Sequence, residues 1–269
     1  MRRMRLSCQI PEIMDFSLAL TFALAVVIGI TLGLLGGGGA ILAVPVLTYI
    51  TGLEPVQAIP TSLFIVGVTS LVSLSLHALK KRVEWRTGLV FGLATMVGAF
   101  AGGRAGAYVP APVLMLSFAA VMTAAAIAMI RGRRQAGAQH EKPQELPISK
   151  VLATGAAVGL VSGFVGAGGG FLIVPALVLL ARLPMPRAVA TSLLIITMQS
   201  ASGLAGYALS TPLDWSLATA IAGLAVAGSF IGFWLSNRLP SQGLRKGFGF
   251  FVLAIAAVVV IEETLLLIG

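Results

Sequence analysis

The sequence predicts an all-α integral membrane protein made of two homologous repeats, and two observations carry the prediction: its composition and a match between its halves. Of 269 residues, 58% are hydrophobic and 10% are charged, and the mean hydropathy is +1.00. Soluble domains are about 45–50% apolar and about 25% charged. So few charges exclude a cytosolic enzyme, a disordered chain and a disulfide-stabilised secreted domain.

The cysteine, the histidines and the net charge limit the ligands and partners that the protein is expected to have. Cys8 is the single cysteine, and His77 lies far from His140, so neither a disulfide nor a metal-ligand spacing is present. The net charge is +9, but the cations cluster in short loops between apolar runs, as in the cytoplasmic loops of membrane proteins. We therefore expect no metal, no cofactor and no nucleic-acid partner.

Eight charge-free runs set the expected membrane segments, since a helix needs about 20 apolar residues to cross the bilayer. The runs are 16–53, 55–79, 87–103, 105–130, 151–181, 188–213, 215–237 and 247–261. Most predict one crossing each. The runs 16–53 and 151–181 are too long for one crossing and each contains a glycine cluster, so each predicts a full helix, a glycine break and a shorter helix.

These runs divide the chain into an N-terminal segment at 1–15, a membrane repeat at 16–130, a basic linker at 131–150 and a second membrane repeat at 151–269. The linker is long, polar and basic, so we expect it in the cytoplasm. Met1 and Met14 are alternative starts, because the apolar run begins directly after Met14.

A shift of 130 residues aligns the two halves without a gap. It places Gly33 on Gly163, Pro45 on Pro175 and Trp85 on Trp215. Because tryptophan and proline match in register, the sequence predicts a duplicated unit of four to five membrane segments.

Two topologies follow from this unit. If the short segments after the glycines cross, there are ten crossings with outer termini, the repeats are inverted, and 14 Lys and Arg lie in inner loops. If those segments are re-entrant, there are eight crossings with inner termini, and the loop cations divide 12 inside to 5 outside. Both topologies place the loops 80–86 and 131–150 in the cytoplasm.

The glycine clusters at 36–39 and 166–170 are the most unusual feature of the sequence. Four small residues in a row break a helix, and such a break is tolerated in a membrane only inside protein or beside a wet cavity. The helix that starts after each break directs free N–H groups and partial positive charge at that place. Paired breaks indicate an anion site in a transporter, whereas close helix packing is the alternative explanation.

Other polar residues leave two interpretations open. The hydroxyls of Thr61-Ser62 and Thr191-Ser192 can donate to a substrate or bond back to the preceding turn. Gln199 is equally explained by an interhelical hydrogen bond or a ligand contact. Arg104 lies beside Tyr108 at an expected helix end, where an arginine side chain usually extends to the lipid headgroups.

The pattern Gly33-x-x-Gly36-x-Gly38-Gly39, followed by Val44-Pro45 and by Ala58-x-x-Thr61-Ser62-Leu63, recurs in the second half. This pattern resembles the sulfite exporter TauE/SafE family over residues 16 to about 261. The resemblance implies a multi-helix permease for sulfite, organosulfonates or related anions. It carries over these substrate-binding positions: Gly36, Gly38, Gly39, Pro45, Thr61, Ser62, Gly166, Gly168, Gly169, Pro175, Thr191 and Ser192.

We therefore expect a secondary transporter, not an enzyme, in the bacterial inner membrane, with a small anionic substrate and the lipid bilayer as partners. A structural or assembly membrane protein without transport activity is the alternative. An intramembrane enzyme needs a nucleophile and base at membrane depth, and no such pair is visible in the sequence. Substrate identity, direction, coupling ion and oligomeric state do not follow from these patterns.

Overall fold

The computed structural model describes residues 9–37, 39–131, 148–165, 170–179, 183–209, 213–236, 238 and 253–261, and these residues form helices and short connections without a strand. The helices are α1 (Gln9–Leu35), α2 (Ala40–Pro45), the π-helical η1 (Val46–Ile50), α3 (Pro55–Leu79), α4 (Trp85–Gly106), α5 (Ala111–Arg131), α6 (Ile148–Val165), α7 (Gly170–Leu179), α8 (Met185–Ala208) and α9 (Trp215–Ser236). Residues 253–261 are also helical. The all-helical prediction is confirmed for this part of the chain.

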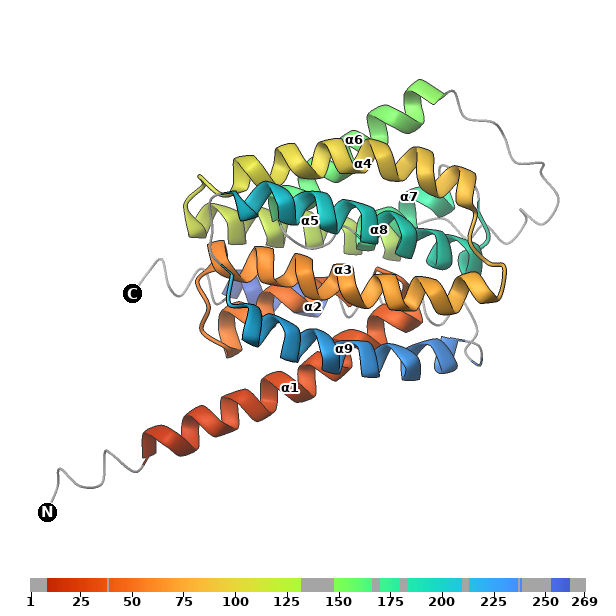
Figure 1. Cartoon of the computed structure of the whole chain (residues 1–269). Helices are drawn as coiled ribbons and strands as arrows, with labels where there is room; N and C mark the ends of the chain where they lie inside the picture. The colour runs from red at the N-terminus through yellow and green to blue at the C-terminus, as the bar shows by residue number, and fades with distance from the viewer. Residues whose placement is uncertain are drawn as a thin grey trace, which may run out of the picture.

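Four of these helices are long and apolar enough to cross a membrane: α3, α4, α8 as far as Tyr207, and α9. They lie side by side in Figure 1. Shorter apolar helices cover Leu20–Leu35, Ala40–Ile50, Ala111–Ala124 and Val151–Val165. The described helices therefore agree with the membrane-protein class that the composition predicts.

Local chemistry fixes several helix ends. Pro55 opens α3, where the missing N–H of proline has no cost. The Asp214 carboxylate accepts hydrogen bonds from the N–H groups of Ser216 and Leu217 and so caps α9. The helix α1 begins at Gln9, earlier than the boundary at residue 16 that the charge-free run predicts.

Contacts between helices fix their directions. Gly67 lies 3.3 Å from the Ser200 side chain and Gly203 lies 3.3 Å from the Leu63 side chain, measured from an ideal Cβ, so α3 and α8 are antiparallel. The ring of Phe64, in the first half of α3, is 5.5 Å from that of Trp215 at the start of α9, and the rings of His77 and Phe233 are 4.8 Å apart near the ends of the two helices. The helices α3 and α9 are therefore parallel.

Glycines at a spacing of four residues join two further pairs of parallel helices. Gly29 and Gly33 of α1 face Gly228 and Gly232 of α9; Gly98 and Gly102 of α4 face Gly159 and Gly163 of α6. A Cβ on any of the eight would overlap a carbonyl oxygen of the facing helix. Small residues at this spacing let helix backbones approach closely within a membrane. We call these contacts the α1–α9 and α4–α6 glycine seams.

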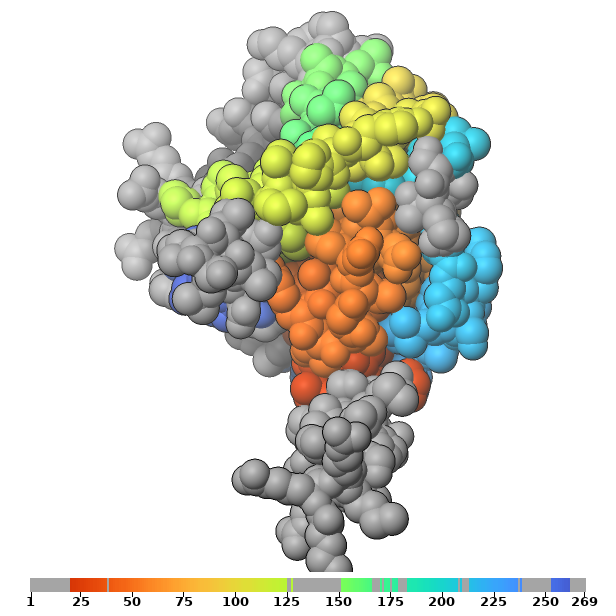
Figure 2. Space-filling view, turned by 90° about the vertical axis from the view of Figure 1, so that its left-hand side faces the viewer, coloured from red at the N-terminus to blue at the C-terminus, as the bar shows by residue number. Residues whose placement is uncertain are grey.

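Charges are divided between the two ends of this bundle. At one end lie the loop after α3 with Lys80, Lys81 and Arg82, the first turn of α8 with Arg187, and Arg238 after α9. Glu84 lies at the same end and pairs with Arg187, with 2.6 Å between Nη1 and Oε1. The other end, which faces the viewer in Figure 2, carries the starts of α3 and α9 and the end of α4, with Glu54, Asp214 and Arg104. One end of the described bundle is thus strongly basic.

The seams predict a position-dependent cost of adding a side chain to α9. Gly228→Val brings a branched side chain against the Val26 carbonyl oxygen, whereas Gly223→Val enters open space on the same helix. Overpacking costs about 1–3 kcal/mol, so we expect Gly228→Val to lower the melting temperature in detergent by about 5 °C or more. Gly223→Val is the matched control, and equal melting temperatures for the two variants would contradict the seam.

Candidate functional site

The first glycine break lies between α1 and α2. The N–H of Gly36 donates to the Leu32 carbonyl at 2.9 Å, and Gly36 has a φ of +76°, which ends α1 in the left-handed region that glycine adopts without strain. An ideal Cβ at Gly36 would stand 2.6 Å from the Ser192 Oγ and 2.9 Å from the Val189 carbonyl oxygen of α8. The break is therefore pressed against the beginning of α8.

The first break meets the start of α7 through backbone atoms. Gly37, in the first break, packs so closely on Gly170, the first residue of α7, that a Cβ on either would overlap the other's backbone. The Ile196 side chain of α8 covers Gly170 from a third side, with its Cδ1 2.6 Å from the ideal Cβ position. Elements that are far apart in sequence thus bring the end of one break and the start of α7 to one place.

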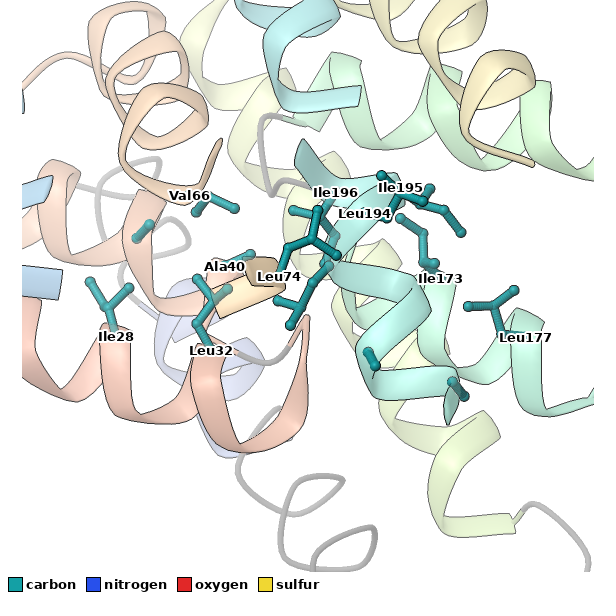
Figure 3. Close-up of a cluster of buried hydrophobic side chains, with 14 of the residues drawn as sticks. Ile28, Leu32, Ala40, Val66, Leu74, Ile173, Leu177, Leu194, Ile195 and Ile196 are labelled. Carbon is teal, nitrogen blue, oxygen red and sulfur yellow. The ribbon is translucent and has the colours of Figure 1, made fainter. Parts of the chain in front are cut away.

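Apolar side chains surround this meeting point. Figure 3 shows Ala40 of α2 and Val66 of α3 facing Ile196 of α8, with Ile28 and Leu32 of α1 on one side and Ile173 and Leu177 of α7 on the other. All of these side chains are at most 1% exposed. In these surroundings no bulk water is present to accept hydrogen bonds from the backbone of the break. Any N–H group there without a protein acceptor would therefore need a ligand as its hydrogen-bond partner.

The remaining residues of the first motif pack within the bundle. Gly39 lies against α1, where a Cβ would overlap the Ile28 carbonyl oxygen. Pro45 is buried in α2, and the helix widens to a π-helix directly after it, with the N–H of Thr51 donating to the Val46 carbonyl at 3.2 Å. These two residues shape the segment that follows the break.

The hydroxyls of the Thr-Ser pairs bond to backbone groups. Thr61 donates to the Gln57 carbonyl, Ser62 to the Ile59 carbonyl and Ser192 to the Val189 carbonyl, at 2.7, 2.7 and 2.8 Å. Thr191 accepts the N–H of Glu84 at 3.0 Å and so joins the basic loop to α8. In this arrangement Ser192 adjoins Gly36, and an oxyanion contact requires its hydroxyl to rotate from the Val189 carbonyl.

Four predicted site residues, Gly38, Gly166, Gly168 and Gly169, lie outside the described residues. Pro175 lies in α7. The structure therefore brings together Gly36, Gly170 and Ser192, with Gly39 and Pro45 behind them, and it places Thr61 and Ser62 on α3.

Several buried polar groups were not among the predicted site residues. Gln199 of α8 is 1% exposed and donates from Nε2 to the Ser162 Oγ of α6, so the interhelical hydrogen bond considered for this residue exists. The hydroxyls of Ser70 and Ser200 are buried with no hydrogen-bond partner among the described residues. The 130-residue shift pairs these two serines, and that pairing is the signal that would have identified them.

Two features limit the chemistry of the site. Within the described segments, no group of three or more His, Cys, Asp or Glu side chains is placed to hold a metal. Arg104 is exposed at the end of α4, with its guanidinium carbon 5.2 Å from the centre of the Tyr108 ring, as expected for an arginine at the headgroups. The candidate site is thus built from backbone groups, hydroxyls and one amide.

Comparison with known proteins gives a consistent result. The family profile described as "Sulfite exporter TauE/SafE" matches residues 21–259. A "Probable membrane transporter protein" of Xylella fastidiosa (strain Temecula1) is 36% identical over 248 residues, which cover 91% of this chain and 95% of that protein. The "Probable membrane transporter protein MJ0441" of Methanocaldococcus jannaschii is 29% identical over 204 residues, 72% of this chain and 75% of that protein.

A further relative is the "Probable membrane transporter protein YunE" of Bacillus subtilis, 28% identical over 253 residues, with 83% of this chain and 91% of that protein covered. No solved structure matches the chain.

The break predicts a difference between two glycines that share one backbone conformation. Gly36 and Gly52 have φ values of +76° and +73°, but only a Cβ at Gly36 meets other atoms within 4 Å. Alanine at either position costs about 1–2 kcal/mol of backbone strain. With radiolabelled sulfite, the substrate proposed below, we expect Gly36→Ala to reduce transport about tenfold or more, since about 1.4 kcal/mol at the bound site is a factor of ten.

Gly52→Ala controls for the strain and should retain most of the uptake. Both variants are compared at equal amounts of membrane-inserted protein. Equal uptake by the two variants would remove Gly36 from the site, and selective loss of the Gly36→Ala protein from the membrane would favour packing alone.

Proposed function

Because the chain belongs to the sulfite exporter TauE/SafE family of membrane transporters, we propose that it moves a small sulfur-containing oxyanion, such as sulfite or an organosulfonate, across the bacterial inner membrane. The substrate binds where the paired glycine breaks meet. Gly36, Gly38, Gly39, Pro45, Thr61 and Ser62 form the first half of that site, and Gly166, Gly168, Gly169, Pro175, Thr191 and Ser192 form the second.

The observation that carries this proposal is the contact between Gly37 and Gly170. It supports one shared site instead of two separate breaks. The helix α7 starts at Gly170 and the helical segment Ala40–Ile50 starts after the first break. Each helix start offers roughly half a positive charge together with free N–H groups, which suits an anion.

Helix directions support inverted repeats around that site. The 130-residue shift relates α3 to α8, and these two helices are antiparallel. It also relates the two glycine seams: the Gly29 contact with Ala225 corresponds to the Gly159 contact with Thr95, and the Gly98 contact with Ala156 corresponds to the Gly228 contact with Val26. Each half thus lends its first helix to the fourth helix of the other half, an arrangement suited to rocking of one repeat against the other.

Helix directions and the distribution of basic loops support ten crossings. Parallel α1, α9 and α3 require the segment α2–η1 to run back between α1 and α3, as a crossing segment does. The basic loops after α3 and α9 and the start of α8 then lie on one side, which the positive-inside rule assigns to the cytoplasm. The eight-crossing alternative requires α3 and α8 to be parallel.

A structural or assembly protein is the competing function. The close backbone packing of Gly39 on α1 is equally expected for it. The contact of Gly37 with Gly170 supports transport instead, because it joins the glycine clusters of the two halves at one place. Transport across the membrane distinguishes the two functions.

Transport is tested by uptake and efflux of radiolabelled sulfite, sulfoacetate and taurine in a deletion strain that carries the gene on a plasmid. We expect movement of at least one of these sulfur compounds, with competition among the oxyanions, because two helix ends worth about 0.3–2 kcal/mol each discriminate weakly. Selective transport of a cation or a neutral sugar without oxyanion competition would refute the substrate class.

Topology gives a separate prediction from reporter fusions. Fusions after Lys81 and Arg238 should report the cytoplasm and a fusion after Asp214 the periplasm, because α8 and α9 run in opposite directions between these points. Cytoplasmic signal at Asp214 together with periplasmic signal at Arg238 would instead establish eight crossings. Periplasmic signal at Lys81 would contradict both topologies.

A further inference from the structure

One face of α8 follows the paired breaks. Ser192, Ile196 and Gln199 stand at i, i+4 and i+7, so their side chains form one stripe along the helix. Ser192 contacts Gly36, Ile196 contacts Gly170, and Gln199 bonds to Ser162, which lies one turn before the end of α6. The stripe therefore connects the first break with the start of α7 and the last turn of α6, and Gln199 is its uncharged polar end.

The amide of Gln199 is only partly satisfied. Its Nε2 donates to the Ser162 Oγ, but Oε1 is buried with no hydrogen-bond partner among the described residues. An unsatisfied buried acceptor costs about 1–3 kcal/mol, a cost that an apolar residue of the same size avoids. Such an acceptor, held in place by a second side chain, is suited to receive a donor from a ligand.

The corresponding positions in the first half are different. The 130-residue shift relates Gln199 to Thr69 and Ser162 to Leu32. The Thr69 hydroxyl donates to the Ile65 carbonyl of its own helix at 2.7 Å. Among the described residues the second half alone carries an amide at this position, so an amide here is not required for the duplicated fold.

We propose that Gln199 is a specificity-determining residue that selects a singly protonated oxyanion, with Oε1 accepting the substrate O–H. This proposal rests on the proposed function and names the protonation state of its substrate. A monoprotonated oxyanion offers the donor that Oε1 lacks and leaves its charged oxygens for the helix starts. A dianion and a sulfonate offer acceptors only, and a dianion also costs more to bring into an apolar interior.

Ser162 is the positioning residue for this contact. Its hydroxyl holds Nε2, which turns Oε1 away from Ser162 and fixes the amide. A side chain held by such a hydrogen bond loses less freedom when the ligand binds. Removal of the Ser162 hydroxyl should weaken the preference for a protonated ligand without removing it.

The test is a competition assay on the full-length protein in nanodiscs, at a pH where sulfite is mostly monoprotonated. Bound radiolabelled sulfite is displaced by unlabelled sulfite or by methanesulfonate, which has no ionisable O–H. For the wild type we expect methanesulfonate to require about tenfold or more higher concentration. The ratio of the two displacement concentrations comes from one sample, so it does not depend on the folded fraction.

We expect Gln199→Leu and Gln199→Met to lower this ratio about tenfold and Ser162→Ala to lower it several-fold. Ser202→Ala is the matched control, because the Ser202 hydroxyl lies on the same helix but donates to the Met96 carbonyl of α4 and has no contact with the Gln199 amide in the hydrogen bonds of the described residues. Its ratio should equal that of the wild type.

An unchanged ratio in the recovered Gln199 and Ser162 variants would overturn the role of Gln199 while leaving the proposed function intact. Ser162→Ala provides this test even if neither Gln199 variant folds. A wild type that binds no displaceable sulfite, or that binds methanesulfonate as well as sulfite, would refute this inference, and in the first case the proposed substrate as well.

Discussion

Close backbone contact at glycine is the constraint on which the rest of this structure depends. In a bilayer the lipid is as apolar as the protein, so helices associate through tight packing and polar contacts instead of through the hydrophobic effect. The α1–α9 and α4–α6 glycine seams supply that packing with eight glycines whose missing Cβ atoms leave room for facing carbonyls. Because each seam joins the first helix of one half to the fourth helix of the other, neither half is expected to reach this packing alone.

The α1–α9 glycine seam also positions the first break. Gly33 packs on α9 three residues before Gly36, so the end of α1 is fixed before the chain turns. The Gly36 backbone then meets α8, and Gly37 meets Gly170 at the start of α7. In the proposed site the binding energy would come mainly from helix starts, each worth about 2 kcal/mol at most, and this magnitude would give a permease of modest affinity. Under this proposal a polar side chain such as Gln199 would have a large share in deciding which anion is bound.

Composition and hydropathy predicted the helical membrane class, since 10% charged residues cannot cover a soluble fold of this size. The register of Trp85 with Trp215 predicts a duplicated unit, but it could not say which helices touch. Pairing of α1 with α9 depends on backbone approach at Gly29 and Gly228, and a glycine pattern does not name its partner helix. The contact between Gly37 and Gly170 is equally non-local.

The candidate site was less predictable than the fold. Gly36 stood out because four small residues in a row break a helix, and its left-handed φ fits that reasoning. The Thr-Ser pairs were ambiguous in sequence, and Ser62 and Ser192 bond back to their own helices. Gln199 was noticed only as an isolated polar residue, because its half-satisfied amide depends on Ser162, 37 positions away.

Hydrogen–deuterium exchange of the purified protein, with and without saturating sulfite, tests the central claim most directly. The claim is that backbone N–H groups at the paired breaks bind the anion, and a bound oxygen slows exchange of those hydrogens. The account predicts slower exchange in peptides covering residues 36–42 and 166–172, with little change at the α1–α9 and α4–α6 glycine seams. Sulfite binding without protection of either break, or with protection confined to another region, would contradict it.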